Sequence, residues 1–450
     1  MKFIRKTQPK IKTQFNKFVI PSIGAMWFFS LYTMVDGAFV GKGVGPHALA
    51  GVNISMPYIS LLFAIAIVFS IGSSNMVSYH LGRGDKEIGD KIFTQSVLLI
   101  LIVGLTISAI AFFNLENLVD ALGAEGQIAE YAYNYLKVIA PFSTFFMLSY
   151  NLEVFVKADG HPSISVRNGV ISSLTNIILD YVFVFIYGWG IEGAAIATVI
   201  SQVLASVLYL WHFIWGDSKL QFLMPKFNGK KILAAIKLGI PEALTEMSIG
   251  FTTFLYNFSI IKYLGIDYIT TYSIIMYVNN LVVNTMIAIS QGSQPLVSYY
   301  YGDENKNNLK NLARLMTLTA LFWGLAFSII TWIFSRQIVS LFISEDLPYL
   351  FSYSVEKLKI FSLGFIITGL SIVIAGYLTA IKQARQGFII SLLRGYINIS
   401  IVLLTIPVLF GGDFIWISSI LSEALTLIIA AYLAYRTLPK LQRKLSKKKE

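Results

Sequence analysis

Long, unbroken apolar stretches are the feature of this 450-residue sequence that most restricts its fold. Residues 59–77, 92–113 and 317–334 are examples. A helix needs about 20 mainly apolar residues to cross the hydrocarbon core of a bilayer. Inside that core every backbone polar group must be paired within the protein, so only α-helices or a closed β-barrel can span it. Because the stretches are continuous and lack the ten-residue alternation of a barrel, they predict an all-α integral membrane protein.

The composition supports a membrane protein and excludes several functions. Only 13% of the residues are charged, whereas about 25% is usual for a soluble domain. The net charge of +11 lies mainly in the tails and loops, so we expect no nucleic-acid partner. The chain has no cysteine, which excludes disulfides, thiolate metal sites and cysteine nucleophiles.

Apolar runs separated by charged or Gly/Pro-rich breaks predict twelve transmembrane spans. Cytoplasmic loops of membrane proteins are enriched in Lys and Arg. If the N-terminus is cytoplasmic, 29 of the 35 Lys and Arg residues fall in cytoplasmic segments. We therefore expect both termini inside the cell and interpret residues 1–17 as a cytoplasmic tail, not a cleaved signal peptide. The predicted spans are 15–41, 52–80, 91–113, 131–158, 163–187, 191–215, 238–262, 270–300, 312–335, 352–380, 385–410 and 413–436.

The first two predicted spans recur 220 residues later without a gap. Six spans separate the copies, so both halves share one topology, which is typical of transporters that bind substrate between two lobes. We expect an N-terminal lobe at 1–215, a cytoplasmic linker at 216–237 and a C-terminal lobe at 238–450 with a basic tail. The matching pairs include Pro21 with Pro241, Gly45 with Gly265, Ser70 with Ser290, Gly72 with Gly292 and Tyr79 with Tyr299.

Four oxygen-bearing residues are predicted at one depth in the outer half of the N-terminal lobe: Asp36, Asn176, Asp180 and Thr198. Acids inside spans are costly and are functional candidates by default. Asn176 and Asp180 are four residues apart and share a helix face. An all-oxygen set with two carboxylates suits a hard cation such as Na⁺ or a proton. The alternative is a structural polar network that ties three helices together.

Two further acids, Glu242 and Glu246, follow Pro241 in the seventh span. Glu242 lies in the first turn, where a carboxylate complements the helix dipole. We interpret both acids as candidates for the central substrate cavity and favour Glu246, which lies one turn deeper. The repeat places Ser22 and Met26 at these two positions, so the lobes differ in polarity.

The remaining membrane-embedded charges receive no functional role. Glu153 and Lys157 are four residues apart and predict a local ion pair. Arg394 and Glu423 lie deeper and could pair within the second lobe. The four histidines fall in loops or span ends, show no metal-ligand spacing, and are interpreted as interfacial: His47, His80, His161 and His212.

No sequence motif for catalysis is present. Residues 82–85 (GRGD) lack the strand and the lysine of a phosphate-binding loop, and no serine-hydrolase or zinc-protease motif occurs. We therefore expect a protein that is not an enzyme and has no cofactor. Because no nucleotide-binding domain is evident, an ion gradient would drive transport, unless the chain is a passive channel or works with another subunit.

Four segments carry a resemblance to a known family: 35–41 (VDGAFVG), 80–85 (HLGRGD), 157–162 (KADGHP), and 176–180 (NIILD) with 190–198 (GIEGAAIAT). With these segments the chain resembles the multidrug and toxic compound extrusion (MATE) family, in its bacterial DinF/MepA-like branch, over essentially its whole length.

The resemblance implies a V-shaped, two-lobed antiporter that exports small organic cations in exchange for protons or sodium. It implies a multi-pass protein of the bacterial cytoplasmic membrane, which we expect to be a monomer. Asp36, Asn176, Asp180 and Thr198 resemble the coupling-ion site of the N-terminal lobe. Glu246 resembles the acid of span seven in the NorM-like branch. That branch also has an acid in span ten, where this chain has Glu356 near the outer end.

Other functions fit less well. A lipid-linked oligosaccharide flippase of the same superfamily is the main alternative, but its polyanionic substrate calls for a basic cavity. The major-facilitator loop motif is incomplete here, an ion channel would need a filter segment that is not evident, and a membrane enzyme lacks a candidate site.

Overall fold

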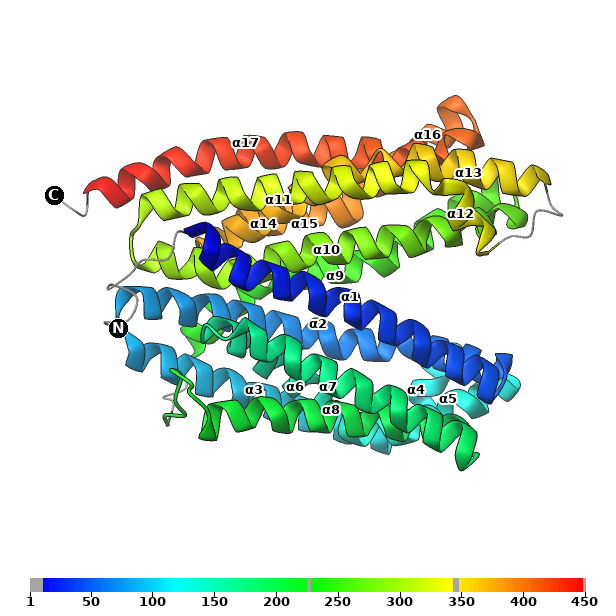
Figure 1. The fold of residues 1–450 in the computed structure, drawn as a ribbon, viewed down its shortest axis with the longest axis horizontal. Helices are drawn as coiled ribbons and strands as arrows, with labels where there is room; N and C mark the ends of the chain where they lie inside the picture. Colours follow the sequence, from blue (N-terminus) through cyan, green and yellow to red (C-terminus); the bar gives the residue numbers. More distant parts are fainter. Residues whose placement is uncertain (1–10, 225–227, 343–347, 448–450) are drawn as a thin grey trace. The chain divides into compact units, whose positions relative to one another are not determined.

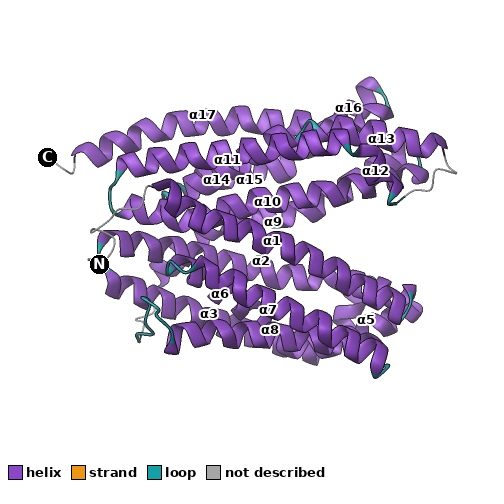
Figure 2. Ribbon diagram, viewed as in Figure 1, coloured by secondary structure: helices purple, strands orange, loops and turns teal. Residues whose placement is uncertain are grey.

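The computed structural model describes residues 11–224, 228–342 and 348–447, and these are almost entirely helical (Figure 1). Among them no β-strand occurs, as the purple and teal ribbon of Figure 2 shows. The predicted all-α fold class is confirmed.

The described chain divides into two compact units. One is Ile20–Gly239, and the other combines the described parts of Met1–Val19 and Ile240–Glu450. Two long helices, α1 (Ile11–Gly43) and α9 (Gly229–Tyr263), each contribute to both units. The start of α1 therefore groups with the second unit, a feature that hydropathy does not indicate.

The unit Ile20–Gly239 is built around α2, which packs against α3, α5 and α6. A buried amide ties three of these helices together, because Asn151 Nδ2 donates to Ser70 Oγ at 2.8 Å and to Ser96 Oγ at 3.1 Å. Besides its parts of α1 and α9, the unit contains α2 (Pro46–Arg83), α3 (Lys86–Phe113), α4 (Leu115–Ala121), α5 (Gly126–Ile139), the 3₁₀ turn η1 (Ala140–Phe142), α6 (Ser143–Ala158), α7 (Pro162–Asp180), the π-helix η2 (Tyr181–Ile186) and α8 (Gly190–Trp215).

The second unit is built in the same order around α10, which packs against α11 and α14. Besides its parts of α1 and α9, it contains η3 (Ile266–Tyr268), α10 (Ile269–Gly302), α11 (Lys306–Ile333), α12 (Ser335–Ser340), α13 (Pro348–Ser362), α14 (Phe365–Ala380), α15 (Ala384–Leu392), the π-helix η4 (Leu393–Ile397), α16 (Asn398–Phe410), η5 (Gly412–Ile417) and α17 (Ser418–Lys447).

Two glycines 220 residues apart permit the same close helix approach in each unit. A Cβ on Gly104 of α3 would lie 3.0 Å from the Cα of Thr144, and one on Gly324 of α11 would lie 2.5 Å from the carbonyl oxygen of Phe365. Small residues let membrane helices approach closely and gain dispersion energy, since lipid offers no hydrophobic driving force. The repeat seen in the sequence is therefore also a repeat of packing.

Each predicted span falls on a helical element, but the count of twelve membrane crossings remains a prediction. Within the described ranges ten helices are long and apolar enough to cross a bilayer, and eleven if α13 and α14, bent by 40° at their junction, form one span. Helix α9 is not among them because its polar residues, Glu242 and Glu246 included, lower its mean hydropathy. The predicted orientation of the termini likewise remains a prediction.

Replacing Gly324 by alanine should destabilise the protein. The new methyl group would clash with the Phe365 carbonyl, and overpacking costs about 1–3 kcal/mol. Gly250→Ala is the matched control, because nothing lies within 4 Å of its Cβ position and alanine favours the helix by up to about 1 kcal/mol. Thermal unfolding in detergent should show a lower Tm for Gly324→Ala only; equal Tm values would contradict the close approach.

Candidate ion and substrate sites

Three helices of the unit Ile20–Gly239 bring the four predicted oxygen-bearing residues together. Asp36 lies in α1, Asn176 and Asp180 lie in the last turns of α7, and Thr198 lies in α8. Asn176 and Asp180 are no more than 1% exposed, and Asp36 is half-buried. Asn176 Nδ2 donates to Thr198 Oγ1 at 3.4 Å, and Thr198 Oγ1 donates to the carbonyl of Ala194 at 3.0 Å.

The carboxyl groups of Asp36 and Asp180 lie within hydrogen-bonding reach of one another. A hydrogen bond between them requires a shared proton, because an ionised carboxylate only accepts. Without that proton, Asp36 Oδ1, both Asp180 oxygens and Asn176 Oδ1 have no donor among the described residues. Burying unpaired polar and charged groups is costly. The geometry can therefore hold a proton between the carboxyls or a cation among these oxygens.

Two tyrosines complete this cluster, and the sequence reasoning missed both. Tyr32 lies one helical turn before Asp36 and is near both carboxyl groups. Tyr135, on α5, bonds the side chain of Thr198 and is also near both acids. The i to i+4 spacing in the run from Tyr32 to Asp36 could have indicated the first tyrosine. No local signal indicates the second, because only packing brings α5 to α8.

A π-helix begins directly after Asp180 and contacts α1. Such segments are rare and are often found at functional sites. Phe39 of α1 packs edge-on against Phe185 with ring centroids 5.5 Å apart. A Cβ on Gly43 would lie 2.4 Å from a methyl group of Val184. The backbone irregularity and the small residue together set how closely the end of α1 approaches the helix that holds Asp180.

In the second unit, the structure places Glu242 and Glu246 one turn apart on α9. Glu242 is buried and accepts a hydrogen bond from Gln294 Nε2 of α10 at 2.5 Å. Glu246 is half-buried. A Cβ on Gly376 would lie 3.1 Å from Gln294 Nε2, so the glycine leaves room for the amide. The structure does not test the predicted role of either glutamate in substrate binding.

The second unit also contains a buried ion pair beside a small cavity. Arg394, in the π-helix η4, lies with Nε 2.9 Å from Glu423 Oε1 of α17. Ser371 Oγ donates to the other carboxylate oxygen at 2.9 Å. The pair lines a cavity of about 50 Å³ together with Tyr256, Tyr272 and other residues. The predicted pairing is confirmed, and in both units a π-helix adjoins or contains a buried ionisable residue.

The predicted local ion pair is confirmed, and the structure also brings two of the histidines together. Lys157 Nζ lies 2.7 Å from Glu153 Oε1. His161 and His212, interpreted as interfacial residues without metal-ligand spacing, meet at Asp159, and His212 is only 5% exposed. Asp159 and His161 lie in the one loop between α6 and α7, whereas His212 lies at the distant end of α8, so spacing along the chain does not show the group.

Comparisons with known proteins agree with the repeat and the fold. The protein-family model MatE matches residues 21–182 and again 241–404. A multidrug export protein MepA from Staphylococcus aureus is 25% identical over 93% of this chain and 92% of its own length. A protein of the same name from Staphylococcus saprophyticus is 26% identical over the same shares.

Solved structures match over nearly the whole chain. An outward-facing multidrug resistance MATE transporter superposes with a TM-score of 0.90 at 21% identity, covering 97% of this chain and 98% of that one. A transporter of the MOP superfamily from Pyrococcus furiosus, described as having a binding pocket of reverse polarity that suggests a different function, superposes with a TM-score of 0.89 at 21% identity over 97% of both chains. These likenesses establish the fold.

Removing one partner of the Arg394–Glu423 pair should destabilise the protein strongly. Arg394→Leu leaves a buried carboxylate uncompensated, which costs about 3–5 kcal/mol, whereas replacing both partners by apolar residues is close to neutral. We expect a markedly lower Tm for Arg394→Leu and recovery in Arg394→Leu/Glu423→Leu. The exposed pair Glu87–Lys91 supplies the control Lys91→Leu, which should leave the Tm nearly unchanged because solvent screens an exposed ion pair. A single variant as stable as wild type would contradict the pairing.

Proposed function

The chain belongs to the MATE family of transporters, and from this premise we propose that it is a multidrug efflux antiporter of a bacterial cytoplasmic membrane. It exports small organic cations and takes up protons or sodium ions in exchange. Residues 1–215 and 238–450 form its N- and C-terminal lobes, joined by a linker at 216–237. It acts as a monomer without a cofactor and catalyses no chemical reaction.

The facing carboxyl groups of Asp36 and Asp180 are the observation that carries this proposal. Two carboxylates in one dry site do not both stay ionised without a counter-ion. The pair therefore has two forms, one that holds a proton or sodium ion and one that has released it and is negatively charged. A coupling site must alternate between two such forms. Asn176 and Thr198 add oxygens from the two neighbouring helices, which favours one small hard ion at a time.

Antiport follows if the coupling ion and the drug favour different conformations. Each ligand shifts the equilibrium only by its difference in affinity for the two states. An ion on Asp36 neutralises the cluster and favours a bent first helix, which releases the drug. Loss of that ion toward the cell interior restores a negative site that attracts the next organic cation. A coupling free energy of about 1–3 kcal/mol between the two ligands is sufficient.

A cationic substrate agrees with the sign of the buried charges. Glu242 and Glu246 on α9 are carboxylates within the second unit, and the buried Arg394 is neutralised by Glu423. A flippase for a polyanionic lipid head group would need unpaired basic groups instead. The Pyrococcus furiosus protein, which has the same fold, is described as having a pocket of reverse polarity that suggests a different function. Transport of a flat organic cation is therefore the function we favour.

Replacing Asp36 by asparagine should abolish coupled efflux. The amide retains the shape of the carboxyl but can neither take up a proton nor attract a cation. We expect efflux of a fluorescent organic cation from proteoliposomes to fall to the background level of protein-free liposomes. Glu246→Gln should weaken drug binding while leaving the ion response in place. Imposing pH and sodium gradients separately on the wild type identifies the coupling ion.

The control is Glu192→Gln, which removes an exposed carboxylate from the first turn of α8 and should leave efflux unchanged. Normal efflux by a correctly folded Asp36→Asn variant would remove this residue from the mechanism. Absence of cation efflux in the wild type, with transport of an anionic lipid-linked sugar, would instead favour the flippase.

A further inference from the structure

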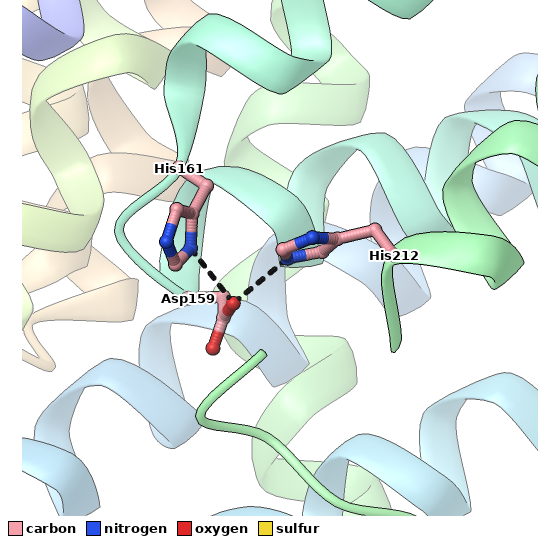
Figure 3. Close-up of side chains that lie close together, drawn as sticks. All are labelled: Asp159, His161 and His212. Atoms are coloured by element: carbon pink, nitrogen blue, oxygen red, sulfur yellow. Dashed lines mark hydrogen bonds and ion pairs between the residues drawn. The ribbon is translucent and has the colours of Figure 1, made fainter. Parts of the chain in front are cut away.

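A cluster of two histidines and an aspartate lies at the end of the unit Ile20–Gly239 where the linker begins, outside the site described above (Figure 3). Asp159 directly follows α6, His161 directly precedes α7, and His212 lies in the last turn of α8. In Figure 3 both imidazole rings point toward one carboxylate oxygen. His161 Nδ1 lies 3.0 Å from Asp159 Oδ2, and His212 Nε2 lies 2.9 Å from the same atom.

The second oxygen of Asp159 fixes the orientation of the carboxylate. The backbone N–H groups of Lys219 and Leu220 donate to Oδ1 at 2.8 and 3.1 Å. Well-built metal sites hold their ligands with such outer hydrogen bonds, which leave one atom of the ligand free for the ion. Oδ2 is thereby directed at the two histidines, and the linker segment that follows α8 is connected to the loop between α6 and α7.

The three atoms that face one another have the composition and spacing of a metal-ligand set: Asp159 Oδ2, His161 Nδ1 and His212 Nε2. One oxygen and two imidazole nitrogens lie within 4.8 Å of one another. Three protein ligands of the His and Asp type, with an open fourth position, are typical of Zn²⁺ sites that keep a bound water. Asp159 and His212 are buried, whereas His161 is 28% exposed on its side chain, which leaves a route for the ion and the water.

The surroundings of Asp159 hold its carboxyl group in the ionised form. Burial alone would raise its pKa, but hydrogen bonds from His161, His212 and the backbone of Lys219 hold the pKa at about 2. Neutral imidazole and ionised carboxylate are the forms that coordinate metals. When a metal binds, the protons on the two ring nitrogens that face the carboxylate leave to solvent or move to the other nitrogen of the same ring.

We propose that Asp159, His161 and His212 bind one divalent transition-metal ion, of which Zn²⁺ fits best, with water as the fourth ligand. The ion replaces the hydrogen bonds between the rings and the carboxylate by three coordinate bonds. It braces the loop between α6 and α7, the end of α8 and the start of the linker. This site is separate from the proposed coupling site at Asp36 and does not depend on the transport function.

The neighbouring charges limit the affinity but permit binding. Lys157 is neutralised by Glu153 at 2.7 Å. Lys219 Nζ lies 3.6 Å from the Cβ position of Gly160 and repels a cation, but its side chain is exposed and solvent screens it. Imidazole and carboxylate suit Zn²⁺ better than Mg²⁺ or Ca²⁺, which prefer oxygen ligands, so the cluster should discriminate between these ions.

The test measures Zn²⁺ binding by the purified full-length chain in detergent after removal of any histidine tag. Competition with a chromophoric chelator gives the stoichiometry and affinity, and the visible spectrum of Co²⁺ reports its ligands and geometry. We expect one ion per chain and a Tm that rises with Zn²⁺ concentration. Zinc should also protect the backbone amides of Lys219 and Leu220 from hydrogen exchange.

His161→Gln is the most informative variant because the side chain is partly exposed and its loss is least disruptive. Asp159→Asn retains an oxygen for the two backbone donors but loses the charge. Both should weaken Zn²⁺ binding by more than the roughly 10–100-fold that loss of an outer-shell partner costs. His47→Gln, at an exposed histidine of α2, should bind like wild type. Absence of stoichiometric binding by folded wild-type protein, or equal affinity in His161→Gln and His47→Gln, would overturn the proposal.

Discussion

The structure depends on one constraint: in hydrocarbon, every backbone polar group must be bonded within the protein, and an α-helix does this within a single segment. This constraint converts the apolar runs into helices, and it makes each buried polar side chain expensive. Some buried polar groups are accordingly paired, as the Asn151 amide nitrogen is with Ser70 and Ser96 and Arg394 is with Glu423. In the cluster of Asp36 and Asp180, by contrast, three carboxyl oxygens lack donors among the described residues.

Two departures from regular helix geometry lie beside buried ionisable groups. The π-helix η2 starts after Asp180, and η4 contains Arg394. Both units use a glycine, Gly104 or Gly324, for one close helix approach. A duplicated scaffold therefore holds different chemistry in its two copies: paired acids in the first unit, and an internally neutralised ion pair in the second. In the proposed mechanism, this difference would let one repeated packing arrangement serve ion coupling in one lobe and substrate binding in the other.

Much of the fold could be predicted from the sequence because its signals are local or periodic. The apolar runs gave helical ranges, and the 220-residue repeat is matched by the equivalent positions of Gly104 and Gly324. Pairs one turn apart, such as Glu153 with Lys157, followed from helix geometry. Contacts made only by tertiary packing could not be predicted. Tyr135 reaches Thr198 from α5, and His212 reaches Asp159 across 53 residues. The grouping of the first residues of α1 with the second unit could not be predicted either, because hydropathy does not indicate which helices a residue packs against.

The central claim is that the Asp36–Asp180 pair releases its ion when an organic cation binds. Proton release from purified protein in weakly buffered detergent, followed with a pH-sensitive dye, measures this directly. Displacement of radioactive sodium is the parallel measurement for the other ion. The account predicts that adding a transported cation releases about one ion per chain from the wild type and none from a folded Asp180→Asn variant. Undiminished release from that variant would contradict it.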